Sequence, residues 1–302
     1  MKRLLIILTF MFINIYLFSL DTDVIEIDTG LYFIPRFFDR ANLIFRKIDG
    51  EFTLSRYNNE TQDIINEGNF KNNVMEACFV INGCLFFYDY QKKIIYEVDI
   101  DSMKIKRRKK IELRWPLYIA SNDFIASYNI LNDTVNEYIE YLDIADGKIN
   151  IKRIYFKNIP NGKYFEPHLF EGGKYILRGS TLTKIWILIR QETYYEIGEY
   201  DPTSELYVKR YSLPYMAGIT SSQRFYSRII ITERKLLVFE EERISVYSGD
   251  GNADYTIPFY SGKYVQIEDY DIVYDRILVE TYPEIYPNTP TQILIINNVN
   301  DL

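Results

Sequence analysis

The sequence predicts an all-β protein with the architecture of a β-propeller, in which six blades of four antiparallel strands surround a central axis. Runs of about four to eight residues rich in isoleucine and aromatic residues are separated by short polar turns. The 302 residues include 28 tyrosines and 19 phenylalanines, which suit pleated, half-buried surfaces. The strand–turn pattern recurs about six times, at spacings of roughly 40 to 60 residues. No stretch after residue 20 shows sustained helical periodicity.

The first 20 residues are predicted to be a signal peptide. Lys2 and Arg3 precede an apolar run from Leu4 to Leu20, and Ser19 is a small residue of the kind found before a cleavage site. An uncleaved membrane anchor is the alternative, because the apolar run is long for a signal peptide. Residues 21–302 are then expected to form a single propeller domain. We expect the protein to be exported, to the periplasm or to the outside of the cell.

The stretch from Leu85 to Leu113 shows one repeat most clearly. It reads LFFYDY, QKK, IIYEVDI, DSM and KIKRRKKIEL, which is three β-like runs joined by two short polar turns. We interpret the last run as the outermost strand of a blade. Its basic segment, Lys104–Lys110, is then expected to be exposed and to discourage edge-to-edge aggregation. A patch that binds an anionic ligand is the alternative interpretation.

Three markers recur along the chain and divide it into repeats. The first is a turn interpreted as the connection between the first and second strands of a blade: Asp39-Arg40, Asn82-Gly83, Asn122-Asp123, Gly172-Gly173, Glu233-Arg234 and Asp275-Arg276. The second is a turn between the third and fourth strands: Asn58-Asn59, Asp101-Ser102, Asp146-Gly147, Asp201-Pro202, Asp250-Gly251 and Asn298. The third is a proline beside aromatic residues in the link to the next blade: Pro35, Pro116, Pro214 and Pro258.

The two ends of the chain are predicted to close the ring. The last repeat has a third strand at Gln292–Ile296 and stops before a full fourth strand, while an unassigned strand, Val24–Ile27, precedes the first repeat. Pairing these two segments would complete the sixth blade and remove an open sheet edge. A seven-bladed ring with one degenerate repeat and a two-domain β-sandwich are the alternatives.

With these features the chain resembles six-bladed secreted or periplasmic bacterial propellers of the broad NHL-like and TolB-like group. The resemblance covers residues 22–302 and rests on the strand–turn rhythm. WD dipeptides, YWTD repeats and the Asp-box are absent from the sequence. The resemblance therefore implies a fold and a cellular compartment, and no catalytic residue is carried over from it.

Residues that commonly bind metals or act as nucleophiles are scarce. His168 is the only histidine, so the usual zinc ligand sets are excluded, and a catalytic triad would have to be built around this one residue. Cys78 and Cys84 flank Asn82-Gly83, which favours a two-residue hairpin that pairs Ile81 with Cys84. Because side chains alternate along a strand, Cys78 then lies on the opposite face, and we expect no disulfide.

Carboxylates are plentiful, but their clusters lie beside predicted turns. Asp269, Asp271 and Asp275 form one cluster and Glu240–Glu242 forms another, and both are expected to be solvated loop residues. No EF-hand or glycine-rich calcium repeat is present. The sequence predicts no cofactor and no metal ion.

The links between blades are predicted to gather on one face of the ring, around the central channel. Aromatic side chains beside arginines suit stacking on sugars or holding a peptide, whereas packing of the aromatics between blades is the alternative. An insertion, Tyr282–Pro287, is expected to reach the same face as a recognition loop. The candidate binding residues are Arg36, Arg114, Trp115, His168, Tyr215, Tyr260, Tyr282 and Tyr286.

These observations predict an exported, non-enzymatic binding propeller whose channel face recognises a protein, a peptide or a glycan of the cell envelope. The formal net charge of −7 argues against nucleic acid as the main partner. Membrane contact is expected only through residues 1–20, if they are retained. A carboxylate-dependent hydrolase or lyase acting on polysaccharide is the alternative function.

Overall fold

The computed structural model describes most of the chain after residue 19. The described residues are 20–26, 36–37, 42–49, 51–58, 63–70, 75–81, 84–89, 91–99, 102, 104–113, 117–121, 124–128, 138–144, 148–160, 174–214, 228–240, 243–249, 252–259, 264–282 and 292–302. This part of the chain contains 24 β-strands, one short 3₁₀ helix and no α-helix. Within it there is no helix of the length and hydropathy needed to cross a membrane.

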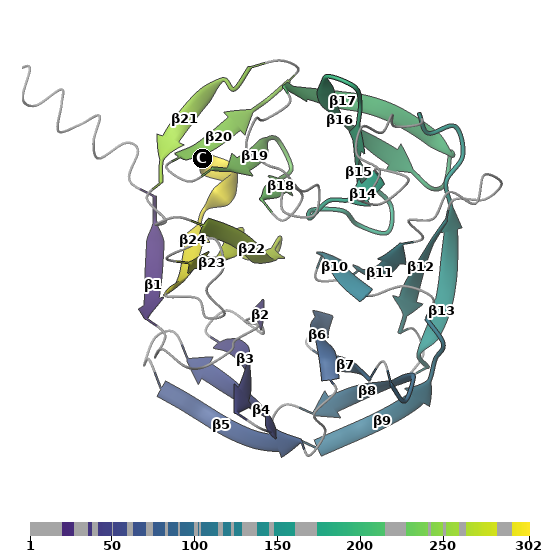
Figure 1. Ribbon diagram of the computed structural model, residues 1–302, viewed down its shortest axis with the longest axis vertical. Coiled ribbons are helices and arrows are strands. Elements are labelled where there is room, and N and C mark those ends of the chain that lie inside the picture. The colour runs from purple at the N-terminus through teal and green to yellow at the C-terminus, as the bar shows by residue number, and fades with distance from the viewer. Residues whose placement is uncertain are drawn as a thin grey trace, which may run out of the picture.

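The described strands form six four-stranded antiparallel sheets, which are arranged around a central axis as the blades of a propeller (Figure 1). In each of the first five blades the chain runs outward, from a first strand at the axis to a fourth strand at the rim.

Blade 1 contains β2 (Arg36–Phe37), β3 (Asn42–Asp49), β4 (Glu51–Asn58) and β5 (Asp63–Phe70). Blade 2 contains β6 (Met75–Ile81), β7 (Cys84–Asp89), β8 (Ile94–Asp99) and β9 (Lys104–Lys110). Blade 3 contains β10 (Leu117–Ser121), β11 (Phe124–Tyr128), β12 (Tyr138–Asp143) and β13 (Asn150–Tyr155).

The second half of the chain continues the same order. Blade 4 contains β14 (Lys174–Ile176), β15 (Ile185–Arg190), β16 (Tyr194–Asp201) and β17 (Leu206–Pro214). Blade 5 contains β18 (Ile229–Ile231), β19 (Leu236–Phe239), β20 (Arg243–Tyr247) and β21 (Tyr255–Pro258). Blade 6 contains β22 (Tyr264–Asp271), β23 (Arg276–Tyr282), β24 (Gln292–Asn297) and, as its fourth strand, β1 (Thr22–Glu26).

Blade 6 confirms the predicted ring closure. β1 pairs antiparallel with β24, with Val24 opposite Leu294, so the first strand of the chain is the outer strand of the last blade. The observed strand begins two residues earlier than the predicted Val24–Ile27. The described strands form six sheets and therefore a six-bladed ring. They do not form the alternatives, a seven-bladed ring with one degenerate repeat or a two-domain β-sandwich.

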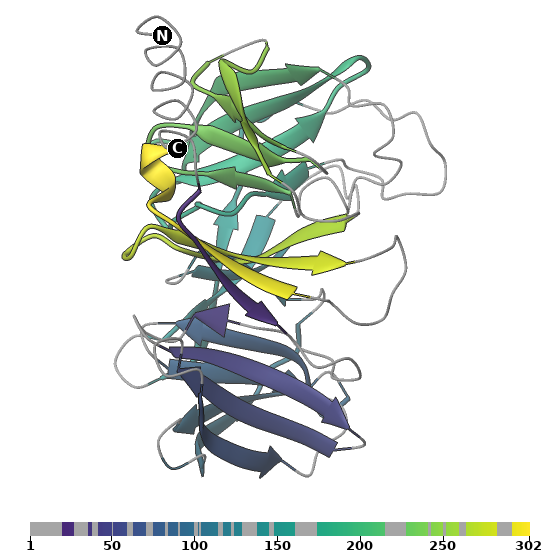
Figure 2. The ribbon, with the colours of Figure 1, turned by 90° about the vertical axis from the view of Figure 1, so that its left-hand side faces the viewer.

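Polar contacts hold the two ends of the chain together beside this strand pair. The backbone N–H of Asn297 donates to the carbonyl of Asp21 at 2.8 Å, and the Asn298 side chain donates to the Asp21 carboxylate at 3.0 Å. The 3₁₀ helix, Val299–Asp301, lies next to the start of β1 (Figure 2). The two ends of the described chain therefore lie on the same face of the ring.

Hydrophobic cores fill the spaces between neighbouring blades, because side chains alternate across each strand and both faces of a blade meet another blade. β15 shows this directly. Ile187 and Ile189 pack with residues of blade 3, whereas Trp186 and Leu188, on the opposite face, pack with residues of blade 5. Burial of each side chain of this size contributes roughly 1.5–3 kcal/mol.

The predicted turns between first and second strands are confirmed in blades 1, 2, 3, 5 and 6. In blade 2 the register pairs Ile81 with Cys84 across Asn82-Gly83, and Cys78 lies opposite Phe87. Cys84 is a free thiol, as expected.

The assignment of the first turn was wrong for blade 4. The strand that follows Gly172-Gly173 is β14, which is the first strand of the blade and not the second. The connection from β14 to β15 instead uses hydroxyl groups: the Ser180 side chain accepts a hydrogen bond from the N–H of Trp186 at 2.9 Å, and the Thr181 hydroxyl accepts one from the N–H of Lys184 at 3.1 Å. Gly179 in this connection has φ +96°, and a Cβ there would lie 2.0 Å from the carbonyl oxygen of Ile231 in blade 5.

The basic segment of blade 2 is the outer strand that the sequence predicts. β9 pairs with β8 and is exposed along its length, with only Arg107 partly buried. The three β-like runs read from Leu85 to Leu113 correspond to β7, β8 and β9.

Candidate functional site

Two of the eight predicted binding residues lie in the described part of the chain, and the fold brings them to the same face. Arg36 begins β2, the first strand of blade 1, and Tyr282 ends β23, the second strand of blade 6. In an antiparallel blade the start of the first strand and the end of the second strand lie on one face. β2 and β22 are neighbours across the boundary between blades 1 and 6. The two positions therefore lie on the predicted channel face, on either side of this boundary.

The other six candidates lie outside the described residues: Arg114, Trp115, His168, Tyr215, Tyr260 and Tyr286. Their convergence on the channel face stays a prediction. One neighbouring aromatic of the links is described. Phe259, next to Tyr260, is buried and packs edge-on against Phe239 of the same blade, with ring centroids 5.6 Å apart. At the link that contains Pro258, packing in the hydrophobic core therefore explains the aromatic residue next to the proline.

The structure adds two buried acidic residues on the strands of blade 6, which the sequence did not identify. Asp269 on β22 and Glu280 on β23 are each only 2% exposed. Asp269 lies opposite Leu278, and Glu280 lies opposite Gln266, so the two acids are diagonal neighbours on one face of the sheet. Their α-carbons are then roughly 7–8 Å apart.

That face is the one turned toward blade 1. Ile267 and Val279, on the opposite face, belong to the apolar core shared with blade 5. Glu280 alternates with Val279 along β23, and Asp269 lies beyond a bulge that follows Ile267. The bulge adds Glu268, itself 5% exposed, as an extra residue in the first strand. Bulges commonly redirect a side chain next to a functional site.

The prediction that the acids around Asp271 are solvated loop residues is therefore wrong for two of the three. Asp269 and Asp271 lie within β22 and are buried, whereas Asp275 is half-buried in the turn. Val265 and Ile267 are apolar residues two positions apart, and this spacing indicates a strand that continues into the acidic stretch. The bulge interrupts the alternation, and this is why the following residues were assigned to a turn.

Buried carboxylates need charged or hydrogen-bonding partners, and blade 6 supplies them in part. The Asp271 carboxylate accepts hydrogen bonds from the Arg276 guanidinium at 3.0 and 3.2 Å, with side chains 5% and 6% exposed. Asp269 accepts a hydrogen bond from the N–H of Tyr270 at 2.9 Å. Arg276 pairs in register with Asp271, on the same face as Leu278, so this ion pair also belongs to the side facing blade 1.

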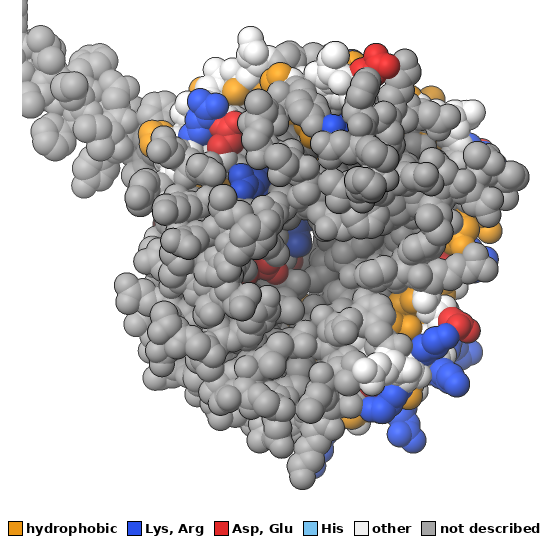
Figure 3. Space-filling model, viewed as in Figure 1, with side chains coloured by type: hydrophobic (Ala, Val, Ile, Leu, Met, Phe, Trp, Pro, Cys, Tyr) orange, Lys and Arg blue, Asp and Glu red, His pale blue; other side chains and the backbone are white. Residues whose placement is uncertain are grey.

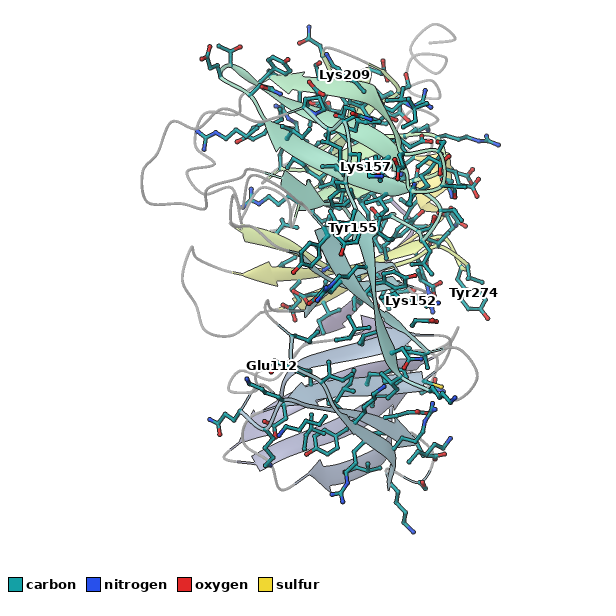
Figure 4. All side chains as sticks on the ribbon, turned by 90° about the vertical axis from the view of Figure 1, so that its right-hand side faces the viewer. Glu112, Lys152, Tyr155, Lys157, Lys209 and Tyr274 are labelled. Carbon is teal, nitrogen blue, oxygen red and sulfur yellow. The ribbon has the colours of Figure 1, made fainter. Side chains whose placement is uncertain are left out.

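The opposite mouth of the ring, where the first and second strands are joined, is occupied by structural contacts. The Asp275 carboxylate accepts hydrogen bonds from the backbone and side-chain nitrogens of Asn300 at 2.9 and 2.8 Å, and burial raises the pKa of this carboxyl. Tyr274 extends outward from the turn between β22 and β23, as Figure 4 shows, and its ring lies 5.2 Å from the Arg276 guanidinium. This face ties the C-terminal helix to blade 6.

The centre of the channel face carries charges of both signs. In Figure 3 acidic and basic side chains are visible inside the central hollow. Arg228, 9% exposed, immediately precedes β18, the first strand of blade 5. The first strands of blades 3 and 6 also approach closely, with Cα atoms of β10 and β22 within 8 Å. The channel is thus narrow at this level.

Among the described residues, no group of three or more histidine, cysteine, aspartate or glutamate side chains is placed to hold a metal ion. The buried glutamates of the third strands in blades 2 to 4 are engaged by outer strands. For example, Glu140 accepts hydrogen bonds from Arg153 at 2.8 and 3.0 Å, and Glu196 accepts one from the Tyr207 hydroxyl at 2.7 Å.

No family model and no curated protein matches the chain. Solved β-propellers are similar to it in structure. The β-propeller domain of Cps50 (Swd1) from Myceliophteria thermophila has a TM-score of 0.51 at 10% identity, over 90% of this chain and 99% of that chain. U3-55K has a TM-score of 0.50 at 9% identity, over 92% and 98%, and the RRP9 WD40 repeats have 0.50 at 9%, over 92% and 97%.

At these identities the similarity is one of fold, and it confirms the β-propeller. The similar structures are WD40 propellers, whereas the sequence lacks WD dipeptides. They support a propeller in the broad sense and not the NHL-like or TolB-like type, so membership of that group stays a prediction.

Proposed function

We propose that the protein is an exported, non-enzymatic scaffold that binds a protein, a peptide or an envelope glycan at the channel face, at the boundary of blades 6 and 1. The observation that carries the proposal is that Asp269 and Glu280 are buried on the side of blade 6 that faces blade 1, the boundary at whose channel-face end Arg36 and Tyr282 lie. Buried charge is costly, so two buried acids on one face of blade 6 are expected to have a role beyond packing. Export rests on the leader, Lys2–Leu20, whose cleavage is part of the proposal.

The test is thermal unfolding of residues 21–302 in the presence of glycans, envelope fragments and peptides. A ligand at 100 times its dissociation constant adds about 2.7 kcal/mol to the free energy of unfolding, which is a shift of a few degrees. We expect one class to raise the melting temperature, and we expect joint Arg36→Ala and Tyr282→Ala changes, which lie at this boundary, to remove the shift. A shift that survives both changes would place the binding site elsewhere on the ring.

A carboxylate-dependent hydrolase or lyase acting on polysaccharide is the second candidate, and Asp269 and Glu280 favour it. Paired acids in glycoside hydrolysis hold their carboxyl groups about 5–10 Å apart, and Asp269 and Glu280 are diagonal neighbours on one face of the same sheet. Release of reducing sugar from any polysaccharide, lost on Glu280→Gln, would establish this activity. Absence of turnover from a polysaccharide that nevertheless stabilises the protein would favour the binding function.

A further inference from the structure

The outer strands of blades 2, 3 and 4 share a basic dipeptide, and its cations are used within each blade. The dipeptides are Lys106-Arg107 on β9, Lys152-Arg153 on β13 and Lys209-Arg210 on β17. Each arginine pairs with a third-strand glutamate: Arg107 with Glu97, Arg153 with Glu140 at 2.8 Å, and Arg210 with Glu199 at 3.4 Å. Two of the lysines pair with the aspartate that ends the third strand, Lys106 with Asp99 at 2.7 Å and Lys152 with Asp143 at 2.5 Å.

This repeated pairing explains why basic residues recur at the rim. The third lysine of the set, Lys209, contacts an aromatic ring of the third strand: its ammonium group lies 5.4 Å from the centre of the Tyr194 ring. Lys152, Lys157 and Lys209 lie along the outer rim of blades 3 and 4 (Figure 4). In these two blades the cations of the dipeptide hold the fourth strand to the third, and little positive charge is left for a partner.

β9 differs because it carries four further cations outside the dipeptide, and three of them are not used within the described chain. Lys104, Arg108 and Lys110 are exposed and make no ion pair or side-chain hydrogen bond with the rest of the described chain. Lys109 is engaged, since it donates to the carbonyl of Ile149 and to the side chain of Asn150 at 3.1 Å. Six of the seven residues of β9 are basic in a protein with a net charge of −7, so the surplus is local. Figure 3 shows Lys and Arg side chains gathered on this side of the rim.

The backbone of β9 is also available to a partner. Its neighbour in the sheet is β8 on one side, and no described strand pairs with its other side. A bulge interrupts the ladder with β8 near Ile105, and the register is regular from Arg107 to Lys110. Every second N–H and C=O of an edge strand points away from its sheet and can accept an added strand.

We propose that the outer edge of β9 is a docking site for an extended, acidic segment of a partner protein, which adds to blade 2 as a fifth strand. Backbone hydrogen bonds to the free edge hold the segment, and its carboxylates pair with Arg108 and Lys110, which lie on one face of the strand, and with Lys104 near its start. The same cations repel another copy of β9, so the edge rejects self-pairing while it selects an acidic strand. This surface is separate from the channel face.

A designed peptide of alternating Glu and Val, with blocked ends, tests the proposal on the full-length chain. We expect it to bind in fluorescence anisotropy, and we expect the triple change Lys104→Glu, Arg108→Glu and Lys110→Glu to weaken it at least tenfold. None of these three residues holds an internal ion pair among the described residues, so the variant should fold, which its melting temperature checks. Single changes provide a matched control: Arg108→Glu should weaken binding several-fold, whereas Arg234→Glu, an exposed arginine of blade 5, should leave it within twofold.

Two altered probes separate strand addition from general attraction between charges. The same peptide with Gln in place of Glu, and the Glu peptide with N-methyl groups on alternate residues, should both fail to bind. Three results would each overturn the proposal. They are binding of the N-methylated peptide, a loss of affinity in Arg234→Glu equal to that in Arg108→Glu, and no binding of the Glu peptide to the unaltered chain. Tighter binding of phosphatidylglycerol vesicles than of the peptide, lost in the triple variant, would assign the edge to a lipid surface and would also overturn it.

Discussion

The two faces of blade 6 differ in what they bury. The face toward blade 5 is covered by an apolar core that includes Ile267, Val279 and Phe239. The face toward blade 1 buries charge instead, with Asp269 and Glu280 on neighbouring strands. Both faces are formed by the same strands, in which successive side chains point to opposite faces of the sheet. The contrast therefore arises from the alternation of residue types along each strand. An apolar boundary stabilises the ring, whereas a charged boundary costs stability unless its charges are paired, and such charges are commonly retained for binding or catalysis.

The largest effect is expected on the apolar face. Phe239→Ala should lower the free energy of unfolding by about 3–5 kcal/mol, because it leaves a cavity between blades 5 and 6 and removes the edge-on contact with Phe259. Urea unfolding measures the change. Val273→Ala, at a turn residue that is 79% exposed, is the control and should change the value by less than about 0.5 kcal/mol. A cost below about 1 kcal/mol for Phe239→Ala would contradict the assignment of this core.

A slightly smaller loss is expected when one partner of the charged face is removed. Asp271→Ala leaves the Arg276 guanidinium buried without its carboxylate, and such changes cost about 3 kcal/mol or more. Replacing both residues, Asp271→Leu with Arg276→Met, should recover most of this loss, because an apolar pair of similar volume avoids the desolvation of two charges. If the double variant were as unstable as the single one, the ion pair itself would be needed for blade 6 to fold.

Much of the fold was predictable because its signals are local. Asn82-Gly83 and the polar turns of blade 2 mark strand ends directly, and the missing fourth strand of the last repeat indicated closure by the first strand. Blade 4 was misassigned because Gly172-Gly173 has the composition of a hairpin turn, while the turn actually used relies on the hydroxyls of Ser180 and Thr181.

The candidate site was harder to predict, since its acidic residues have the composition of a loop. Asp269 and Asp271 lie in a stretch rich in acids beside a turn, and a sequence gives no direct sign that such residues are buried. Burial follows from pairing of β22 with β23 and from the bulge at Glu268, which shifts the alternation by one residue. The partners that make burial possible come from strand pairing, as Arg276 on β23 does for Asp271 on β22.

The measurement that tests the central claim most directly is the ligand panel repeated on the double variant Asp269→Asn with Glu280→Gln. Both changes keep the size of the side chain and remove its charge. We expect the ligand-induced shift of a few degrees to be lost in the variant, measured against the variant's own unfolding temperature without ligand. A variant that keeps the full shift would contradict the claim that the charged boundary of blades 6 and 1 is the binding site.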